Sequence, residues 1–206
     1  MKKLLALLLV LTTTMGLAAC RNKGADKNPT TDPTTQPTTE ATIDTTVDSQ
    51  ANGATQVLTT IWNAVAEDKK FFAMGGDMEN MVDNAPGNYS LTDEGITTVL
   101  CVPADQVQHV DQASSLIHGM MANHFTGAVL HMANGADASA FADAMKANID
   151  STRWLCGTPE KLLIAVIDGQ YVLAAFGLTD NINAFETALA TAYADSQIKY
   201  SEAIIG

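Results

Sequence analysis

The sequence predicts an α+β fold for residues 56–206: a mainly antiparallel sheet built from two hairpins, with helices packed on one face. Three observations support this prediction. Short β-rich runs occur in pairs, an Asp-Gly dipeptide separates the runs of one pair, and an amphipathic helical pattern follows each pair. Because a sheet and a helix each bury an apolar face against another element, this order indicates a ββαββα-like domain with a buried layer between sheet and helices.

Five elements are expected before Asp137. In chain order they are a helix, a loop, a β-type run, a helical turn and a first hairpin, at residues 55–65, 75–95, 96–102, 104–110 and 114–133. Thr55 is a candidate N-cap for the helix, and Pro103 stops the β-type run because proline lacks an amide donor. Gly, Asn and Asp are frequent in the loop, which we expect to contain one helical turn at 78–82. The segment 114–121 also fits a helical period, but we interpret it as the strand that pairs with 126–133.

The second half of the domain has clearer boundaries. Asp137 is a candidate N-cap for a helix with one apolar stripe. That stripe consists of Phe141, Met145 and Ile149. Asp168-Gly169 predicts a two-residue hairpin turn of type I′, since both central residues of that turn need a positive φ. Thr179 or Asp180 is expected to cap the final helix, whose buried face consists of Ile182, Phe185, Leu189 and Tyr193.

The hairpin at 162–176 is apolar along nearly its whole length rather than at alternate residues. A strand with one exposed face shows alternation, so we expect both faces of this hairpin to be buried. Leu163 and Ile164 point to opposite faces, because neighbouring residues of a strand do so. We expect one face to cover the helices and the other to lie beneath the N-terminal helix and the loop at residues 75–95, which we call the Met-rich loop. The alternative is dimerisation through the sheet.

The N-terminus has the features of a bacterial lipoprotein signal. Two lysines precede an apolar run from Leu4 to Val10, and small residues lead up to Cys20 in the sequence Leu17-Ala18-Ala19-Cys20. Lipoprotein processing requires a cysteine directly after the cleavage point, because its sulfur takes the lipid. We therefore predict that residues 1–19 are a signal peptide and that Cys20 is lipidated. The alternatives are an uncleaved membrane anchor or an ordinary signal peptide, although the apolar run is shorter than the ~20 residues that span a bilayer.

A Thr- and Pro-rich segment separates Cys20 from the domain. Pro29, Pro33 and Pro37 are each followed by two threonines. The segment has almost no large apolar residue to bury, so folding would not recover its conformational entropy. We predict that residues 20–55 are the lipidated cysteine and a disordered stalk, which holds a single globular domain of residues 56–206 away from the membrane.

The chain is acidic. Its 11 basic and 23 acidic side chains give a formal net charge of -12, and removal of Lys2 and Lys3 with the signal peptide changes this to 9 minus 23, or -14. We expect no nucleic-acid partner, because phosphate binding needs clustered Lys and Arg. An anionic lipid surface would also repel the chain. Attachment to the membrane must therefore depend on the lipid of Cys20, and two acyl chains are sufficient for stable anchoring.

The two remaining cysteines, Cys101 and Cys156, are a candidate disulfide pair. An extracytoplasmic compartment permits this bond, and closing the loop of 55 residues between them would stabilise the fold by on the order of 4 kcal/mol in the chain-entropy model. The alternative is that Cys101 is a buried thiol, since it lies inside the apolar run from Val99 to Val102. The sequence leaves both interpretations open.

Four short motifs occur along the domain: Val102-Pro103-Ala104-Asp105-Gln106-Val107, Met120-Met121-Ala122-Asn123, Thr158-Pro159-Glu160-Lys161 and Asp168-Gly169-Gln170-Tyr171-Val172. Together with the order of elements, they resemble the small lipoproteins of Gram-positive (Firmicutes) gut bacteria that carry a domain of unknown function. The resemblance covers residues 96–176. It implies a Firmicutes-type cell surface and supplies no catalytic or binding residue. The chain departs from this family in the His and Met content of residues 117–132 and in having two additional cysteines.

No catalytic, metal or cofactor motif is recognised in the sequence. His109, His118, His124 and His131 fall within 23 residues. They form no His-Glu-x-x-His pattern and have no Cys-x-x-Cys beside them, so we assign no metal ligand. The acidic segment 77–83 lacks the ligand pattern of a calcium loop. We therefore expect no catalytic residue and no cofactor.

These observations favour a membrane-anchored extracytoplasmic lipoprotein of unknown function, on the outer face of the cell membrane. Its domain is expected to bind an unknown extracellular ligand or protein. The alternative is a small cell-wall hydrolase that uses Cys156 as nucleophile and one of the histidines as base. The methionines of the domain are interpreted as core residues, with an adaptable apolar groove for a peptide or lipid as the alternative.

Overall fold

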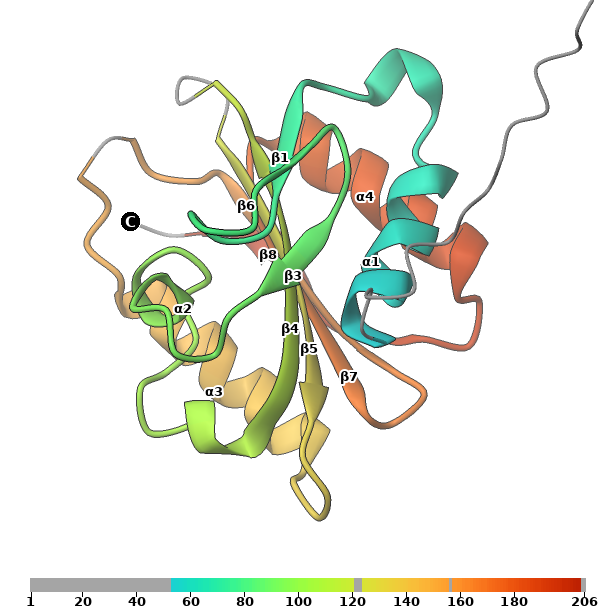
Figure 1. Cartoon of the computed structure of the whole chain (residues 1–206). Helices are drawn as coiled ribbons and strands as arrows, with labels where there is room; N and C mark the ends of the chain where they lie inside the picture. Colours follow the sequence, from blue (N-terminus) through green and yellow to red (C-terminus); the bar gives the residue numbers. More distant parts are fainter. Residues whose placement is uncertain (1–52, 121–123, 156, 205–206) are drawn as a thin grey trace, which may run out of the picture. The chain divides into compact units, whose positions relative to one another are not determined.

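The structure is a computed structural model that describes residues 53–120, 124–155 and 157–204 (Figure 1). Its helices are α1 (Gly53–Ala64), α2 (Gly95–Thr98), α3 (Ala138–Ser151) and α4 (Thr179–Ala192). Its strands are β1 (Ala73–Gly75), β2 (Val82–Asp83), β3 (Gly87–Tyr89), β4 (Val110–His118), β5 (Phe125–Met132), β6 (Lys161–Ile167), β7 (Tyr171–Gly177) and β8 (Gln197–Ala203). The predicted α+β class with a mainly antiparallel sheet is confirmed.

The predicted signal peptide, Cys20, most of the stalk and Cys156 lie outside the described residues. The first helix begins at Gly53, so residues 53–55 belong to the domain and not to the stalk. Ala54 and Thr55 are buried in that helix, which explains why the helix starts earlier than predicted. None of the helices in the described part of the chain is long and apolar enough to cross a membrane.

The eight strands form one sheet in the order β2-β1-β4-β5-β7-β6-β8, and β3 also pairs with β4. Every pairing is antiparallel. The two predicted hairpins form the middle of the sheet, where β4 pairs with β5, β5 with β7, and β7 with β6. The ββαββα topology is not confirmed, because β1, β2 and β3 extend the sheet beyond β4 and β8 extends it beyond β6.

The segment between α1 and β4 differs from its prediction. Residues 75–95 are loop for most of their length, as predicted, but they contain the short strands β2 and β3 and lack the helical turn expected at 78–82. The β-type run at 96–102 is wrong, because its first residues belong to α2 and the φ of Cys101 is 56°, which no strand permits. The helical turn expected at 104–110 is confirmed as a short 3-10 helix, Val107–His109. Strands of two or three residues are too short to show alternation, so their existence depends on their partner strand.

Helices cover both faces of the sheet, which corrects the expectation of helices on one face (Figure 1). The helix α3 packs on β6, β7 and β8, whereas α1 and α4 pack against each other on the opposite face. The two faces bury separate apolar clusters, one with α3 and one with α1 and α4. The physical cause is that the central strands are apolar on both sides, so helices on one side alone would leave a large apolar face in water.

The hairpin of β6 and β7 shows this arrangement most clearly. Leu163 and Ile164 are both 0% exposed, so the predicted burial of both faces is confirmed. Leu163 belongs to the cluster under α1 and α4, and Ile164 belongs to the cluster under α3. The Met-rich loop does not provide the expected cover, because Met78 and Met81 are 83% and 47% exposed. Burial of the hairpin therefore requires no second copy of the chain.

The predicted turn and the predicted cap of α3 are confirmed. Asp168 and Gly169 have φ values of 50° and 68°, the positive values that a type I′ turn requires. The side chain of Asp137 accepts hydrogen bonds from the amides of Ser139 and Ala140, at 2.8 and 3.1 Å. These predictions succeed because each depends on residues that are adjacent in the sequence.

Two other predicted caps are wrong. Thr55 lies inside α1, where its buried hydroxyl donates a hydrogen bond to Oδ1 of Asn88 at 2.6 Å. The helix α4 is capped neither by Thr179 nor by Asp180. Instead, the amide of Thr179 donates to Oε2 of Glu160 at 2.9 Å. In both cases a residue distant in sequence supplies the hydrogen-bond partner, and a local pattern does not reveal it.

Candidate functional site

A cavity of about 430 Å³ opens at the end of the sheet where β4 ends and β5 begins. Four parts of the chain line it: the end of α2, the adjoining ends of β4 and β5, the loop after α3, and the end of β7. The lining residues are Thr98, Val99, Ile117, His118, Met120, His124, Phe125, Thr126, Thr152, Arg153, Trp154, Leu155, Gly157, Pro159 and Phe176. We call this cavity the apolar pocket. Its volume lies in the range of small-molecule sites, about 300–1,000 Å³.

The rim of the apolar pocket gathers exposed apolar side chains. Val99, Met120 and Leu155 are 39%, 56% and 95% exposed, and they are three of the eight exposed large apolar residues of the described chain. Behind the rim, the ring of Trp154 lies 5.4 Å from that of Phe176, which is buried. Grouped exposed apolar side chains indicate a binding surface, because a ligand that covers them removes apolar area from water at about 25 cal/mol per Å².

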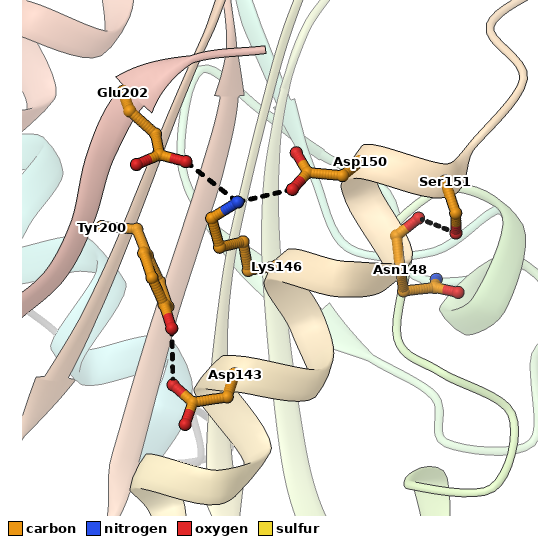
Figure 2. Close-up of polar contacts among 7 residues, drawn as sticks. All are labelled: Asp143, Lys146, Asn148, Asp150, Ser151, Tyr200 and Glu202. Atoms are coloured by element: carbon orange, nitrogen blue, oxygen red, sulfur yellow. Dashed lines mark hydrogen bonds and ion pairs between the residues drawn. The ribbon is translucent and has the colours of Figure 1, made fainter. Parts of the chain in front are cut away.

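The C-terminal end of α3 fixes two walls of the pocket. The helix ends at Ser151, and the hydroxyls of Ser151 and Thr152 both donate to the carbonyl of Asn148, at 3.0 and 2.8 Å (Figure 2 shows the first of these bonds). The side-chain amide of Asn148 donates to the carbonyl of Cys101 at 2.9 Å. The loop after α3 is thereby tied to the chain that follows α2, so the two walls keep a defined separation.

His118 contributes a neutral polar group to the pocket. It is the last residue of β4, and its ring stacks on Phe71 with 4.6 Å between the ring centroids. The amide of Met120 donates to Nδ1 of His118 at 3.0 Å, so the neutral ring carries its hydrogen on Nε2. Burial lowers the pKa of His118 from its ordinary value of 6.5. The imidazole is therefore uncharged at neutral pH, with Nε2–H as its remaining donor.

His124 lies against the loop after α3. A Cβ built on Gly157 would be 2.7 Å from Nε2 of His124, and Gly157 has a φ of 103°, so a glycine is required where the loop passes the ring. The amide of Leu178 donates to the carbonyl of His124 at 2.9 Å, which ties the start of β5 to the end of β7. His124 thus forms part of the pocket wall.

The predicted cysteine pair is only partly described. Cys101 is 1% exposed and is a free cysteine among the described residues, whereas Cys156 lies outside them. The disulfide between them stays a prediction. Burial raises the pKa of Cys101 to about 11, although a hydrogen bond with Thr152 opposes this rise. The thiol of Cys101 is therefore protonated at neutral pH and is no nucleophile in this state.

The four histidines that fall within 23 residues of the sequence do not converge on one site. His118 and His124 line the apolar pocket, whereas His131 lies at the other end of β5, with Nδ1 2.5 Å from Oδ1 of Asp111. His109 lines a different cavity. Within residues 53–120, 124–155 and 157–204, no three His, Cys, Asp or Glu side chains are grouped so that they could hold a metal ion.

A polar cluster lies between α3 and the edge strand β8 (Figure 2). Nζ of Lys146 is 2.5 Å from Oδ2 of Asp150 and 2.9 Å from Oε1 of Glu202. The hydroxyl of Tyr200 donates to Oδ1 of Asp143 at 2.8 Å. Hydrogen bonds to these carboxylates raise the pKa values of Lys146 and Tyr200. A lysine or tyrosine that acts as a base needs a lowered pKa, so we interpret this cluster as contacts that hold α3 against β8.

A comparison of the chain with protein-family models, with curated proteins and with solved structures finds no match. The interpretation of the apolar pocket therefore depends on its own residues. Their exposure, their apolar character and their convergence from four parts of the chain are the features of a ligand site.

The apolar pocket is not predicted from the sequence, which singles out Cys20, Cys101 and Cys156 and assigns no helix or strand to residues 154–159 of the loop after α3. A signal was present in that loop, because Trp154 and Leu155 are large apolar residues in a segment without strand or helix periodicity. Large apolar side chains in a loop that covers no predicted core indicate either a core contact or a binding surface. Trp154 packs on the buried Phe176, whereas Leu155 is exposed at the rim of the pocket.

Proposed function

We propose that this chain is a lipid-anchored lipoprotein on the extracytoplasmic side of a Gram-positive membrane, and that its domain binds an extracellular ligand in the apolar pocket. The lipoprotein signal that ends in Leu17-Ala18-Ala19-Cys20 supports the anchor, and the Thr- and Pro-rich stalk supports a position of the domain away from the membrane surface. The resemblance of residues 96–176 to Firmicutes lipoproteins supports the cell type. The described domain supplies the binding site.

The observation that carries the binding role is the rim of the pocket. Val99, Met120 and Leu155 leave apolar surface in water around a cavity of about 430 Å³. Exposure of this kind opposes solubility, and grouped around a cavity it indicates a binding surface. A ligand that fills the cavity and covers the rim removes this apolar surface from water.

Binding of the neutral dye Nile red tests the role of the pocket. The protein is the chain of residues 20–206 with Cys20→Ser, which carries no lipid to compete for the site. We expect saturable binding, and a loss of affinity of about tenfold or more when Met120→Asp and Leu155→Asp place two charges on the rim. Met78→Asp and Ile198→Asp are the matched controls, because both residues are exposed and lie outside the pocket lining. Equal binding by both pairs of variants would refute the pocket.

Cys20→Ser tests the anchor. In a Gram-positive host, the natural chain should appear in the membrane fraction and incorporate labelled palmitate. The variant should leave the membrane or remain as an unprocessed precursor, while Cys101→Ser, which changes a buried thiol elsewhere, should behave as the natural chain. A Cys20→Ser variant that matures to the same mass and takes up the label would contradict the proposal.

The second candidate function is a cell-wall hydrolase with Cys156 as nucleophile. One observation favours it: the ring of His124 lies against Gly157, the residue that follows Cys156. Incubation with peptidoglycan fragments tests this function. Turnover that is abolished by Cys156→Ala and by His124→Ala, but kept by Cys101→Ala, would establish the hydrolase. Absence of turnover would leave binding as the function of the pocket.

A further inference from the structure

We infer that the ligand of the apolar pocket is a small amphipathic anion, with an apolar body that fills the cavity and one carboxylate that pairs with Arg153. This inference rests on the proposed binding function, and it names the chemical class of the ligand. Three observations carry it: the charge pairing of the domain, the composition of the pocket lining, and the donors that the lining offers.

Arg153, the one arginine of the domain, forms no ion pair with any residue that the structure describes. Residues 53–204 carry 6 basic and 18 acidic side chains, so their formal charge is 6 minus 18, or -12. Four of the six basic residues, Lys70, Lys146, Lys161 and Lys199, each lie within 4.0 Å of a carboxylate oxygen. The other two are Lys69 and Arg153, and neither forms an ion pair with any described residue. Of these two, only Arg153 lines the apolar pocket.

Among the described residues, the lining of the apolar pocket contains no Asp or Glu. Two other cavities of the domain each include an aspartate, Asp137 in one and Asp180 in the other. In a domain with three acidic side chains for each basic one, an acid-free lining with an arginine is a local reversal of charge. An anion bound here meets a guanidinium and no carboxylate of the lining. The overall charge of -12 still opposes ligands of high negative charge, which favours a single anionic group.

The donors of the lining match a carboxylate. A guanidinium presents two parallel N–H groups that fit the two oxygens of one carboxylate, and such bonds are shorter and stronger than neutral ones. His118 adds its Nε2–H as a neutral donor, since Nδ1 is occupied by the amide of Met120. Around these groups, Val99, Leu155 and Phe176 supply the apolar contacts for the body of the ligand. The geometry thus combines one anion partner with a cavity suited to a hydrocarbon or aromatic group.

Calorimetric titration with three ten-carbon probes tests this inference. Decanoate, decan-1-ol and decyl phosphate share one apolar body and differ in their head group. With the Cys20→Ser chain of residues 20–206, we expect decanoate to bind about tenfold more tightly than decan-1-ol, which corresponds to one charge-assisted contact on an exposed rim. Decyl phosphate should bind more weakly than decanoate, because its higher charge is opposed by the acidic domain.

Arg153→Gln should remove the preference for decanoate and leave the affinity for decan-1-ol unchanged. Lys69→Gln is the matched control, because Lys69 is the other basic residue of the described chain that forms no ion pair there, and it lies at another cavity. This substitution should change neither affinity. Equal affinities of the natural chain for decanoate and decan-1-ol would overturn the inference. So would a preference for decanoate over decan-1-ol that persists in Arg153→Gln, or binding of decyl phosphate that is tighter than binding of decanoate. Each of these results leaves apolar binding intact, whereas failure of all three probes and of Nile red would refute the proposed function itself.

Discussion

Shortening Leu163 or Ile164 to alanine tests whether the sheet is buried on both faces. Both side chains are 0% exposed, and they belong to separate clusters on opposite sides of β6. Replacing a fully buried Leu or Ile by Ala costs about 2–5 kcal/mol, from lost transfer free energy and from the cavity that remains. We therefore expect each substitution to lower the free energy of unfolding by about 3 kcal/mol. Ile198→Ala is the matched control, because Ile198 is 45% exposed on the edge strand, and it should cost less than about 1 kcal/mol.

The assay is guanidinium denaturation of the Cys20→Ser chain, followed by circular dichroism in the far ultraviolet. The slope of the free energy against denaturant concentration should stay the same in all variants, so that a shift of the midpoint reports stability. Tryptophan emission then locates each change, because Trp62 shares the cluster of Leu163 whereas Trp154 packs against the cluster of Ile164. If either core substitution lowers the free energy of unfolding by no more than Ile198→Ala does, that face of the hairpin is exposed and the packing of helices on both faces of the sheet is wrong.

Three further predictions concern single residues. Burial raises the pKa of Cys101 to about 11, so this thiol should resist iodoacetamide at pH 8 in the folded chain, and labelling of the folded chain would contradict its burial. If Cys101 also fails to label in denaturant without reductant, it forms the disulfide with Cys156. Asp77→Ala should cost about 2–4 kcal/mol at pH 7, because the buried carboxylate accepts three backbone amide bonds. Burial raises the pKa of Asp77, but these bonds outweigh it and hold the pKa below 3.8. The stabilisation is therefore present above pH 3.8 and is lost as the pH falls through the folded-state pKa, and a cost that does not decrease as the pH is lowered below 3.8 would contradict this. Lys146→Met should lower the free energy of unfolding by only about 1 kcal/mol, and by less at high salt, because its ion pairs are partly exposed. It should leave decanoate binding unchanged, and a loss of binding would show that the polar cluster of α3 and β8 has a functional role.

The sequence predicts the hairpin of β6 and β7 well, because its signals are local. Asp168-Gly169 specifies the turn, and the apolar runs beside it show that both faces are buried. Periodicity does not show what covers each face. The hairpin packs under α1 and α4 on one side and under α3 on the other, and these helices are separated from it by different lengths of chain. The number of layers therefore depends on long-range contacts that no window of sequence contains.

The elements missed at the ends of the sheet have a related cause. The strand β8, Gln197–Ala203, alternates polar and apolar residues only weakly and is half exposed, so its extended form depends on pairing with β6. The strands β1 and β3 are three residues long and both pair with β4. Such short segments become strands only because a formed strand offers them hydrogen-bond partners.

The apolar pocket was beyond sequence reasoning for a different reason. Its lining comes from four parts of the chain between Thr98 and Phe176, and its defining property is exposure in the folded state. Apolar residues such as Val99 and Met120 have the same appearance in the sequence as core residues. That Arg153 has no ion-pair partner among the described residues likewise becomes visible only in the folded structure.

Mapping of decanoate binding by two-dimensional NMR of the amide groups tests the central claim most directly. Titration of the labelled Cys20→Ser chain should shift the amide signals of residues 117–120, 124–126 and 153–157 and of Phe176, while those of the His109 cavity at residues 133–137 stay in place. Shifts that centre on residues 133–137, or that are absent throughout the domain at saturating decanoate, would contradict the account of this protein as a binding module with its site at the end of the sheet.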